Sequence, residues 1–322
     1  GRKGFNMIFL EIILLIIGFT LLVKGADAFV DGCSGLAKSF GIPSLIIGLT
    51  IVAFGTSAPE LAVSLVAAIQ GNSAISVGNV VGSNICNMLL VLGGASLFGT
   101  LRCKKKVVER DYFYLLISYF TLLIISFGTF SMGAKTGIIN RVDGLLLVCF
   151  LVIYVYSLII DTKKEITKED KNKEKITFIK ILFIIVGLIA IISGGELVVN
   201  SATSLARMIG LSESVIALTI VAVGTSLPEL VTSVVAVKKG ESDLAIGNVI
   251  GSNIFNIFLI LGLSATVNSL IINFATLIDM LVMLAAGLLV YGFILKDQKV
   301  TRQRGIILLV FYFSYVCYLL VR

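Results

Sequence analysis

Long apolar segments follow one another along the whole chain, separated by short polar stretches. Most of them reach the roughly 20 residues that a helix needs to cross the hydrocarbon core of a bilayer. The pattern predicts an all-α polytopic membrane protein. The first and sixth segments exceed this length, so their helices are expected to tilt or to project into solvent. We expect ten transmembrane helices, at residues 8–38, 43–70, 73–98, 110–129, 137–161, 177–209, 213–238, 242–268, 274–295 and 303–321.

Two polar stretches interrupt the apolar pattern, and each of them occurs twice. The first copy comprises residues 53–60 (AFGTSAPE) and 78–87 (GNVVGSNICN), and the second comprises residues 222–229 (AVGTSLPE) and 247–256 (GNVIGSNIFN). The offset between matched positions is constant, since 229 − 60 and 256 − 87 both equal 169. A constant offset at so many polar positions indicates that one structural unit was duplicated.

The duplication divides the chain into two halves of five predicted helices each. We expect one repeat at residues 7–161 and the other at 177–322, joined by a charged cytoplasmic linker at 162–176. Residues 1–6 precede Met7 and are interpreted as an expression scar. Because five is odd, the second repeat enters the membrane from the opposite face, which predicts inverted topology. In many secondary transporters, inverted repeats with interrupted helices hold the substrate near the bilayer midplane.

Composition agrees with a membrane protein and narrows its chemistry. Hydrophobic residues make up 57% of the chain and charged residues 14%, which leaves no room for a separate globular domain. The absence of His excludes histidine ligands and histidine acid–base catalysis. The five cysteines have no paired spacing, so neither a disulfide framework nor a zinc site is indicated.

The basic residues indicate topology rather than a nucleic-acid partner. The net charge is +7, but Lys and Arg are concentrated in loops on one side of the predicted bilayer, around residues 102–110, 163–180, 238–239 and 296–304. The positive-inside rule places these loops in the cytoplasm and both termini outside. No nucleic-acid site is needed to explain the charge.

The first repeated stretch is predicted to break a membrane helix and to expose oxygen atoms. Pro59 and Pro228 each remove a helical hydrogen bond, and Gly55 and Gly224 loosen the same turns. Unpaired backbone within the bilayer is tolerated only where it faces protein or a water-filled cavity. The Ser and Thr hydroxyls can alternatively bond back to the preceding turn. The candidate neutral ligands are the carbonyls of Ala53, Thr56, Ala222 and Thr225 and the hydroxyls of Thr56, Ser57, Thr225 and Ser226.

Glu60 and Glu229 place one carboxylate in each broken helix. A carboxylate inside the membrane costs several kcal/mol unless it is compensated, and it marks a functional site by default. Two such groups brought together repel each other, and a bound cation removes both penalties. Oxygen ligands without nitrogen or sulfur suit Ca2+ and also Na+. The alternative is that each carboxyl group is protonated and hydrogen-bonded.

The second repeated stretch adds polar side chains at helical spacing. Ser83 and Asn87 are four residues apart and share a helix face, as do Ser252 and Asn256 in the other copy. All four are candidate ligands. Asn84 lies on a neighbouring face, where it can bond the broken helix instead of an ion.

The two motifs together resemble the alpha repeats of the cation/calcium antiporter superfamily. The sequence Gly-Thr-Ser-x-Pro-Glu followed by Gly-Asn-x-x-Gly-Ser-Asn-Ile-x-Asn occurs twice, and the likeness, which is strongest to the prokaryotic Na+/Ca2+ exchanger branch, covers essentially the whole chain. It implies a protein of a prokaryotic plasma (inner) membrane in which the first and sixth helices slide across the other eight. It also implies that Glu60 and Glu229 are ligands shared by Ca2+ and Na+, and that Ser83 and Ser252 line outer sites. Members of this family often have Asp where this chain has Asn256, so the predicted site holds only two acidic residues.

The function predicted from the sequence is secondary antiport, in which Na+ entry drives Ca2+ out of the cytoplasm. H+/Ca2+ exchange on the same scaffold is the alternative, with Glu60 and Glu229 as proton carriers. A passive channel is disfavoured because channel filters are usually built by several subunits around one pore. No nucleophile–base pair indicates an enzyme. We expect Ca2+ and Na+ as substrates and lipid as the surroundings, with no cofactor and no obligatory protein partner.

Overall fold

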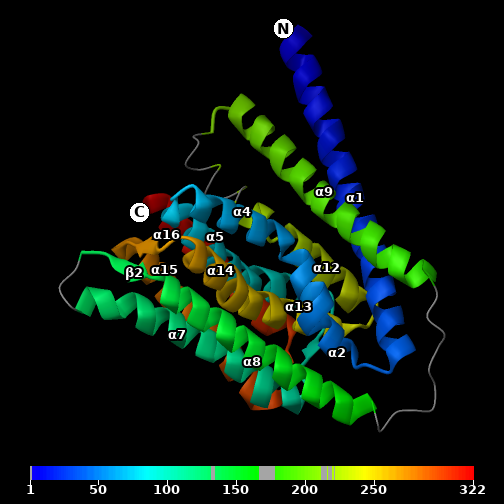
Figure 1. Cartoon of the computed structure of the whole chain (residues 1–322). Helices are drawn as coiled ribbons and strands as arrows, with labels where there is room; N and C mark the ends of the chain where they lie inside the picture. The colour runs from blue at the N-terminus through cyan, green and yellow to red at the C-terminus, as the bar shows by residue number, and fades with distance from the viewer. Residues whose placement is uncertain (1, 132–134, 167–177, 212–215, 217–219, 221) are drawn as a thin grey trace.

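The computed structural model describes residues 2–131, 135–166, 178–211, 216, 220 and 222–322, and in these parts the chain is mostly helical (Figure 1). Short π-helical segments interrupt several helices, at η1 (Gly48–Val52), η2 (Asn87–Val91), η3 (Val107–Asp111) and η5 (Asn256–Leu261). The α-helices are α1 (Arg2–Phe40), α2 (Ser44–Ile47), α3 (Ala53–Thr56), α4 (Ala58–Ile69), α5 (Ser73–Cys86), α6 (Leu92–Ser96), α7 (Tyr112–Ser131), α8 (Arg141–Ile166), α9 (Phe178–Met208), α11 (Ala222–Gly224), α12 (Leu227–Lys238), α13 (Ser242–Phe255), α14 (Gly262–Val267), α15 (Phe274–Asp297) and α16 (Arg302–Val321).

The helices have the length and apolarity of membrane spans. Within the described residues, eight helices can cross a bilayer, or nine if the bent pair Ser44–Thr56 and Ala58–Ile69 forms one span. The remaining predicted span, 213–238, is only partly described, as α11 and α12. The described fold is thus that of a mostly helical polytopic membrane protein.

The predicted break in the span 43–70 is confirmed. Helix α3 ends at Thr56 and α4 begins at Ala58, with a bend of 49° between the two arms of the span. Pro59 lies in the first turn of α4, where its missing N–H removes no helical hydrogen bond. Ser57 has φ −83° and ψ 7°, and Ser226 in the second copy has nearly the same backbone, φ −90° and ψ 4°.

Helices α1 and α9 pack against each other along one edge of the molecule, and the beginning of α1 extends beyond the other helices (Figure 1). Their contact is backbone to backbone at glycines. A Cβ on Gly25 would lie 2.9 Å from the carbonyl oxygen of Gly187, and one on Gly194 would lie 2.8 Å from that of Gly18. Small residues allow membrane helices to approach this closely.

The broken helices and the helices that follow them form the centre of the molecule. Every residue of α13 from Leu244 to Phe255 is buried, and α13 packs against α2, η1 and α3 of the first half of the chain. Peripheral helices instead expose large apolar side chains such as Ile124 and Val142. This division is that of a protein whose outer surface faces lipid.

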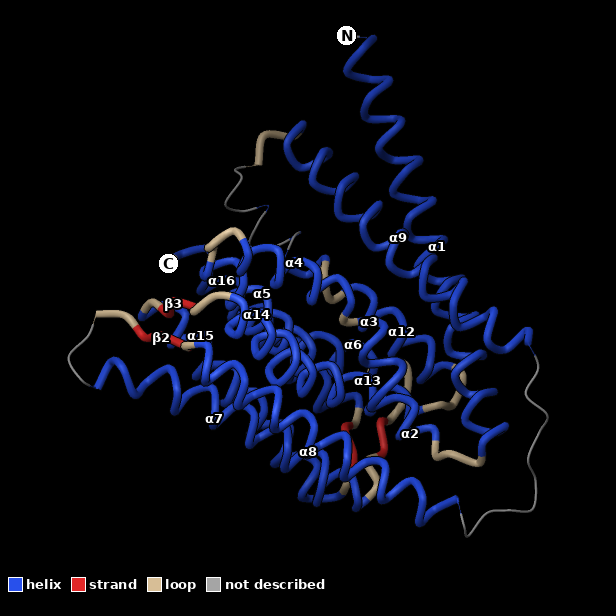
Figure 2. The backbone as a smooth tube through the Cα atoms, in the orientation of Figure 1, coloured by secondary structure: helices blue, strands red, loops and turns tan. Residues whose placement is uncertain are grey.

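Two small antiparallel sheets connect the halves of the chain (Figure 2). Strand β1 (Leu101–Arg102) pairs with β4 (Lys299–Val300), and β2 (Gly137–Ile139) pairs with β3 (Leu270–Ile272). Each sheet therefore takes one strand from each predicted repeat.

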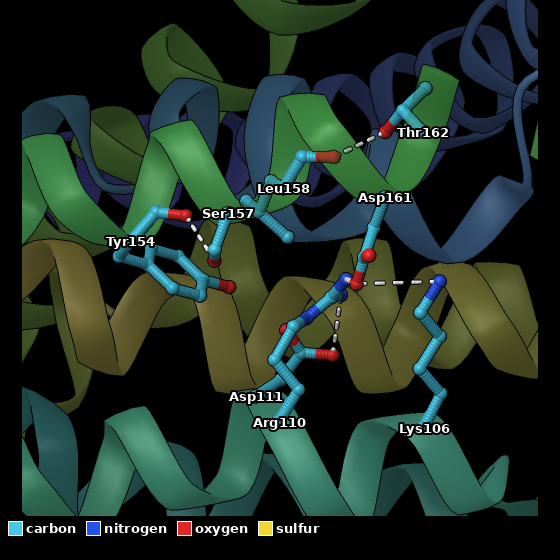
Figure 3. A network of polar contacts seen from close by, with 8 residues as sticks. All are labelled: Lys106, Arg110, Asp111, Tyr154, Ser157, Leu158, Asp161 and Thr162. Atoms are coloured by element: carbon cyan, nitrogen blue, oxygen red, sulfur yellow. Dashed lines mark hydrogen bonds and ion pairs between the residues drawn. The ribbon is translucent and has the colours of Figure 1, made fainter. Parts of the chain in front are cut away.

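A charged network joins Lys106 and η3, which directly precede α7, to the end of α8 (Figure 3). Arg110 donates to the buried Asp111 at 2.8 Å and to Asp161 at 2.6 Å, and Lys106 lies 3.4 Å from Asp161. Helix α8 continues to Ile166, so the first residues of the predicted linker 162–176 are helical. The rest of that linker, from residue 167, lies outside the described residues.

Candidate cation-binding site

Glu60 and Glu229 are both fully buried, each in the first turn of the helix that follows its break. The partial positive charge of a helix N-terminus favours a carboxylate at this position. Ser83 lies 3.5 Å from Oε1 of Glu60, and Ser57 donates to Oε1 of Glu229 at 3.1 Å. The other oxygen of each carboxylate, Oε2, is buried and has no hydrogen-bond partner among the described residues.

Hydroxyl groups from both copies of the motif surround the carboxylates. Thr56 donates to Oδ1 of Asn248 at 2.9 Å, and the hydroxyls of Ser83 and Thr225 lie 3.4 Å apart. The hydroxyl of Ser226 is buried without a partner in the described part of the chain. Five of the six predicted Ser and Thr ligands therefore form contacts within this cluster, namely Thr56, Ser57, Ser83, Thr225 and Ser252.

Ala53, one of the predicted backbone ligands, is the first residue of α3. The carbonyl of Ala53 accepts the N–H of Ser57 at 3.1 Å and contacts the hydroxyl of Ser252 at 3.4 Å. This oxygen lies in the cluster, but it is not free of protein partners. Ala222 begins α11, directly after a residue outside the described set.

Asn87 and Asn256 belong to a buried network of amide side chains. Asn256 donates to Oδ1 of Asn84 at 2.9 Å, and Asn87 donates to Oδ1 of Asn253 at 3.3 Å. Asn84 also donates to the backbone carbonyl of Asn253, so its described contact as a donor is with α13 and not with the broken helix that the sequence indicated. Within the described residues, the Oδ1 atoms of Asn87 and Asn256 are buried without donors. They are available as acceptors.

Asn79 and Asn248 contribute to the site, although sequence reasoning gave them no role. Asn79 donates to the backbone carbonyl of Glu60 at 3.2 Å and to Ser64 at 2.9 Å. Asn248 donates to the carbonyl of Glu229 at 3.3 Å and to Ser233, the counterpart of Ser64, at 3.0 Å. The signal that could have identified them is the offset, because 248 − 79 is also 169.

Two cavities reach the hydroxyl cluster and share Val63 and Thr225 in their walls. One, of about 410 Å³, lies between the broken helices and α9 and is lined by Glu196 and Asn200. The other, of about 420 Å³, is lined by Asn79 and Ser83 and by residues of α15 and α16. Both cavities thus border residues of the candidate site.

The donor set is one of hard oxygen atoms around two negative charges. Among the described residues no group of three or more His, Cys, Asp or Glu side chains forms a metal cluster. Two carboxylates with hydroxyl, amide and carbonyl oxygens suit Ca2+ and Na+ better than the softer transition metals.

Comparison with known proteins identifies the family. Residues 10–160 and 179–321 match the family described as sodium/calcium exchanger protein. The chain is 33% identical over 345 residues to the sodium/calcium exchanger MaX1 of Methanosarcina acetivorans, across 96% of this chain and 98% of that protein. It is 37% identical over 266 residues to the inner membrane protein YrbG of Escherichia coli, across 79% of each.

A solved structure agrees with these matches. The sodium-calcium exchanger NCX_Mj, soaked with 2.5 mM Na+ and 0.1 mM Ca2+, is similar at a TM-score of 0.80 and 32% identity, across 96% of this chain and 98% of that one. The resemblance inferred from the repeated motifs is confirmed. The chain is an integral multi-pass membrane protein, and it belongs to the sodium/calcium exchanger family of antiporters.

Proposed function

We propose that the protein exchanges Na+ for Ca2+ by alternating access and that it extrudes Ca2+ from the cytoplasm. One observation carries the proposal: two fully buried carboxylates, Glu60 and Glu229, each present an oxygen without a hydrogen-bond partner among the described residues. Within the described residues, neither carboxylate forms an ion pair. Uncompensated buried charge is costly, and a transported cation compensates it.

The proposed ligands surround these two carboxylates and come from both repeats. The relatives' names, sodium/calcium exchanger MaX1 and NCX_Mj, support Na+ and Ca2+ as the two ions. The hydroxyls beside each carboxylate provide sites for Na+ that a proton antiporter does not need. The set is Glu60, Glu229, Thr56, Ser57, Thr225, Ser226, Ser83, Ser252, Asn87 and Asn256, with the carbonyls of Ala53 and Ala222.

The proposed architecture is a pair of inverted five-helix repeats, at 7–161 and 177–322, with ten spans. Two observations support it. The contacts of Asn79 recur at Asn248 with every partner shifted by 169 residues, as 248 − 79 shows. In addition, the two strand pairs are equivalent. Strands β1 and β3 each follow the third span of their half, and each pairs with the strand before the last span of the other half, β4 and β2 respectively.

The proposed movement is a sliding of α1 and α9 as one unit. Their glycine contact makes them a tightly packed pair, and one wall of the cavity lined by Glu196 and Asn200 comes from α9. The uneven charge of the loops supports a cytoplasmic location for the linker and an outside location for both termini. The name of the Escherichia coli relative, inner membrane protein YrbG, supports a prokaryotic inner membrane.

The test is calcium-45 uptake into proteoliposomes loaded with Na+, compared with choline-loaded vesicles at fixed pH. We expect uptake that requires internal Na+ and is lost in Glu60→Gln and in Glu229→Gln. The matched control is Glu109→Gln, because the side chain of Glu109 is 63% exposed. Uptake driven by an imposed pH gradient without Na+ would assign H+/Ca2+ exchange instead, and no uptake under either gradient would exclude Ca2+ as substrate.

A further inference from the structure

One of the two cavities has an ion pair in its wall. We call it the entrance cavity and define it by Ile75, Asn79, Ser83, Thr225, Asp279 and Arg322. Arg322 binds Asp279 through two parallel contacts, of 2.9 Å and 3.1 Å, and its guanidinium lies over the ring of Tyr318. Such a two-pronged arginine–carboxylate pair has a fixed geometry.

The entrance cavity connects this ion pair to the candidate site. Asn79, Ser83 and Thr225 form one part of its wall, and Ser83 lies 3.5 Å from the carboxylate of Glu60. Asp279 and Arg322 are the only charged residues among the described residues that line it. A cation that moves through this cavity therefore meets their combined charge before it reaches Glu60.

The pair is partly accessible to water. The side chain of Arg322 is 32% exposed and that of Asp279 is 15% exposed. Partial burial opposes the charge of Arg322, but the hydrogen bonds to Asp279 outweigh it and raise its pKa. Arg322 therefore stays cationic at all physiological pH values, and the pair as a whole is neutral.

We propose that the Asp279–Arg322 pair sets the charge of this entrance and thereby the preference between divalent and monovalent cations that pass through it. The proposal rests on the cation exchange proposed above. The Coulomb energy of a divalent ion near a fixed charge is twice that of a monovalent ion. If the charge of the entrance changes the apparent affinity for Na+ by some factor, it changes the apparent affinity for Ca2+ by the square of that factor. Because Arg322 offsets the negative charge of Asp279, it keeps the preference for Ca2+ over Na+ small.

The first test measures apparent KM for Ca2+ and for Na+ in proteoliposomes, with the ion varied on the face that carries Arg322. At about 10 mM ionic strength, where screening extends over about 30 Å, we expect Arg322→Gln to lower KM about threefold for Na+ and about tenfold for Ca2+. Asp279→Asn should raise KM about threefold for Na+ and about tenfold for Ca2+. The double variant should return close to the parent, and every effect should shrink to below about twofold at 0.15 M salt.

The opposite signs of the two single variants separate an electrostatic entrance from a structural clamp. A clamp between α15 and α16 would be broken equally by Arg322→Gln and Asp279→Asn, so both would lose activity in the same direction and the double variant would not recover. That result would overturn the proposal. Arg302→Gln is the matched control, because Arg302 is an exposed arginine at the opposite end of α16.

A second test reads the entrance charge without any transport. Ile75→Cys places a thiol in the wall of the cavity, in a background with the exposed cysteines changed by Cys149→Ser and Cys317→Ser. Cys33, Cys86 and Cys103 remain because they are buried, and burial raises the pKa of Cys103 to about 12. The probes are a cationic and an anionic methanethiosulfonate reagent of similar size.

We expect Arg322→Gln to raise the ratio of cationic to anionic labelling rates at the new thiol and Asp279→Asn to lower it. If the parent does not transport Ca2+ but the labelling ratio changes in this way, the proposed exchange fails and the charged entrance stands. If transport is present while the labelling ratio and both KM values stay unchanged in the variants, the entrance proposal is overturned and the exchange stands.

Discussion

At the scale of single residues, two amide side chains contact the helix turns that carry the two buried acids. Asn79 and Asn248 each hold the backbone of the first turn in which a glutamate lies, and they do so through the same two contacts. A carboxylate ligand is useful only if its backbone has a fixed position. We interpret the two asparagines as positioning residues for Glu60 and Glu229.

Replacing the buried amide of Asn248 should weaken both stability and ion binding. Asn248→Leu leaves the carbonyl of Glu229 and the hydroxyl of Ser233 without this donor, and an unpaired buried polar group costs about 1–3 kcal/mol. We expect a lower free energy of unfolding by that amount and a higher Ca2+ concentration for half-maximal uptake. The control is Gln303→Leu, because Gln303 is exposed. This variant should change the free energy of unfolding by no more than about 0.5 kcal/mol and should leave the Ca2+ concentration for half-maximal uptake unchanged.

A third carboxylate at position 256 should increase the stabilisation of the fold by Ca2+. Asn256 donates to Oδ1 of Asn84 at 2.9 Å, and an ionised Asp at this position has no proton to donate. We expect Asn256→Asp to lower the unfolding temperature without Ca2+ and to enlarge the shift that Ca2+ produces, measured by thermal unfolding in detergent. Asn256→Leu removes the ligand atom as well, so it should lower the temperature without enlarging the shift; equal Ca2+ shifts in both variants would remove Asn256 from the ligand set.

At the scale of elements, the sequence predicted long features well and short ones poorly. The apolar runs and the Gly-Thr-Ser-x-Pro-Glu motif were enough to locate the long helices and the break at Ser57. The apolar pattern did not indicate the π-helical segments η1, η2 and η5. The strands were missed because each is two or three residues long and exists only through its partner in the other half.

Ion pairs connect one end of the α1–α9 pair to the rest of the molecule. Lys239 forms ion pairs with Asp27 at 2.8 Å and Asp31 at 2.6 Å, and Ser34 donates to Glu241 at 2.5 Å. The duplication places Gln70 where Lys239 stands, since 239 − 169 is 70, so the opposite end has no cation at this position. One end of α1 is thus fastened to the turn between α12 and α13 by charge.

Removing this charge should loosen α1 locally. A partly exposed ion pair contributes up to about 1 kcal/mol, so we expect Lys239→Gln to increase hydrogen–deuterium exchange in α1 around residues 27–40 by up to about fivefold. The neighbouring Lys238→Gln is the control, because Lys238 lies over the ring of Phe98 and not beside α1. Equal exchange in both variants would show that the ion pairs do not restrain the helix.

The same restraint should be insensitive to pH in the neutral range. Partial burial opposes the charge of Lys239, but hydrogen bonds to Asp27 and Asp31 raise its pKa above the ordinary value. A raised pKa contributes stability that is complete below the unfolded value, about 10.4, and is lost only as pH rises through the folded value. The ratio of exchange rates between Lys239→Gln and the parent should therefore be constant from about pH 6 to pH 9.

At the scale of the whole molecule, the two halves are packed into each other. Helix α13 packs on η1 and α3, α14 packs on α8, and α15 packs on α7, so each contact joins the first half to the second. The duplication in the sequence predicted two repeats, but an offset of 169 could not show which faces meet. That information lies in the shapes of apolar surfaces from both halves.

Cutting the chain between the halves should leave the molecule assembled. We expect a protease site inserted after residue 170 to be cleaved without separating the fragments, which should co-purify in detergent and retain Na+-dependent Ca2+ uptake. The measurement is size-exclusion chromatography followed by uptake in proteoliposomes, with uncleaved protein as the control. Fragments that elute separately would show that the contacts between halves are weaker than their extent suggests.

The exchange of strands between the halves also has a consequence for biosynthesis. Strand β1 leaves the ribosome long before β4, and β2 long before β3, so both sheets stay incomplete until most of the second half has been translated. The helices of the first half therefore lie in the membrane, with unpaired strand edges and without α13, until the second half has been synthesised. Unpaired edges favour wrong association. Slow translation of the second half, or a stop before Leu270, should accordingly expose the nascent chain to membrane quality control.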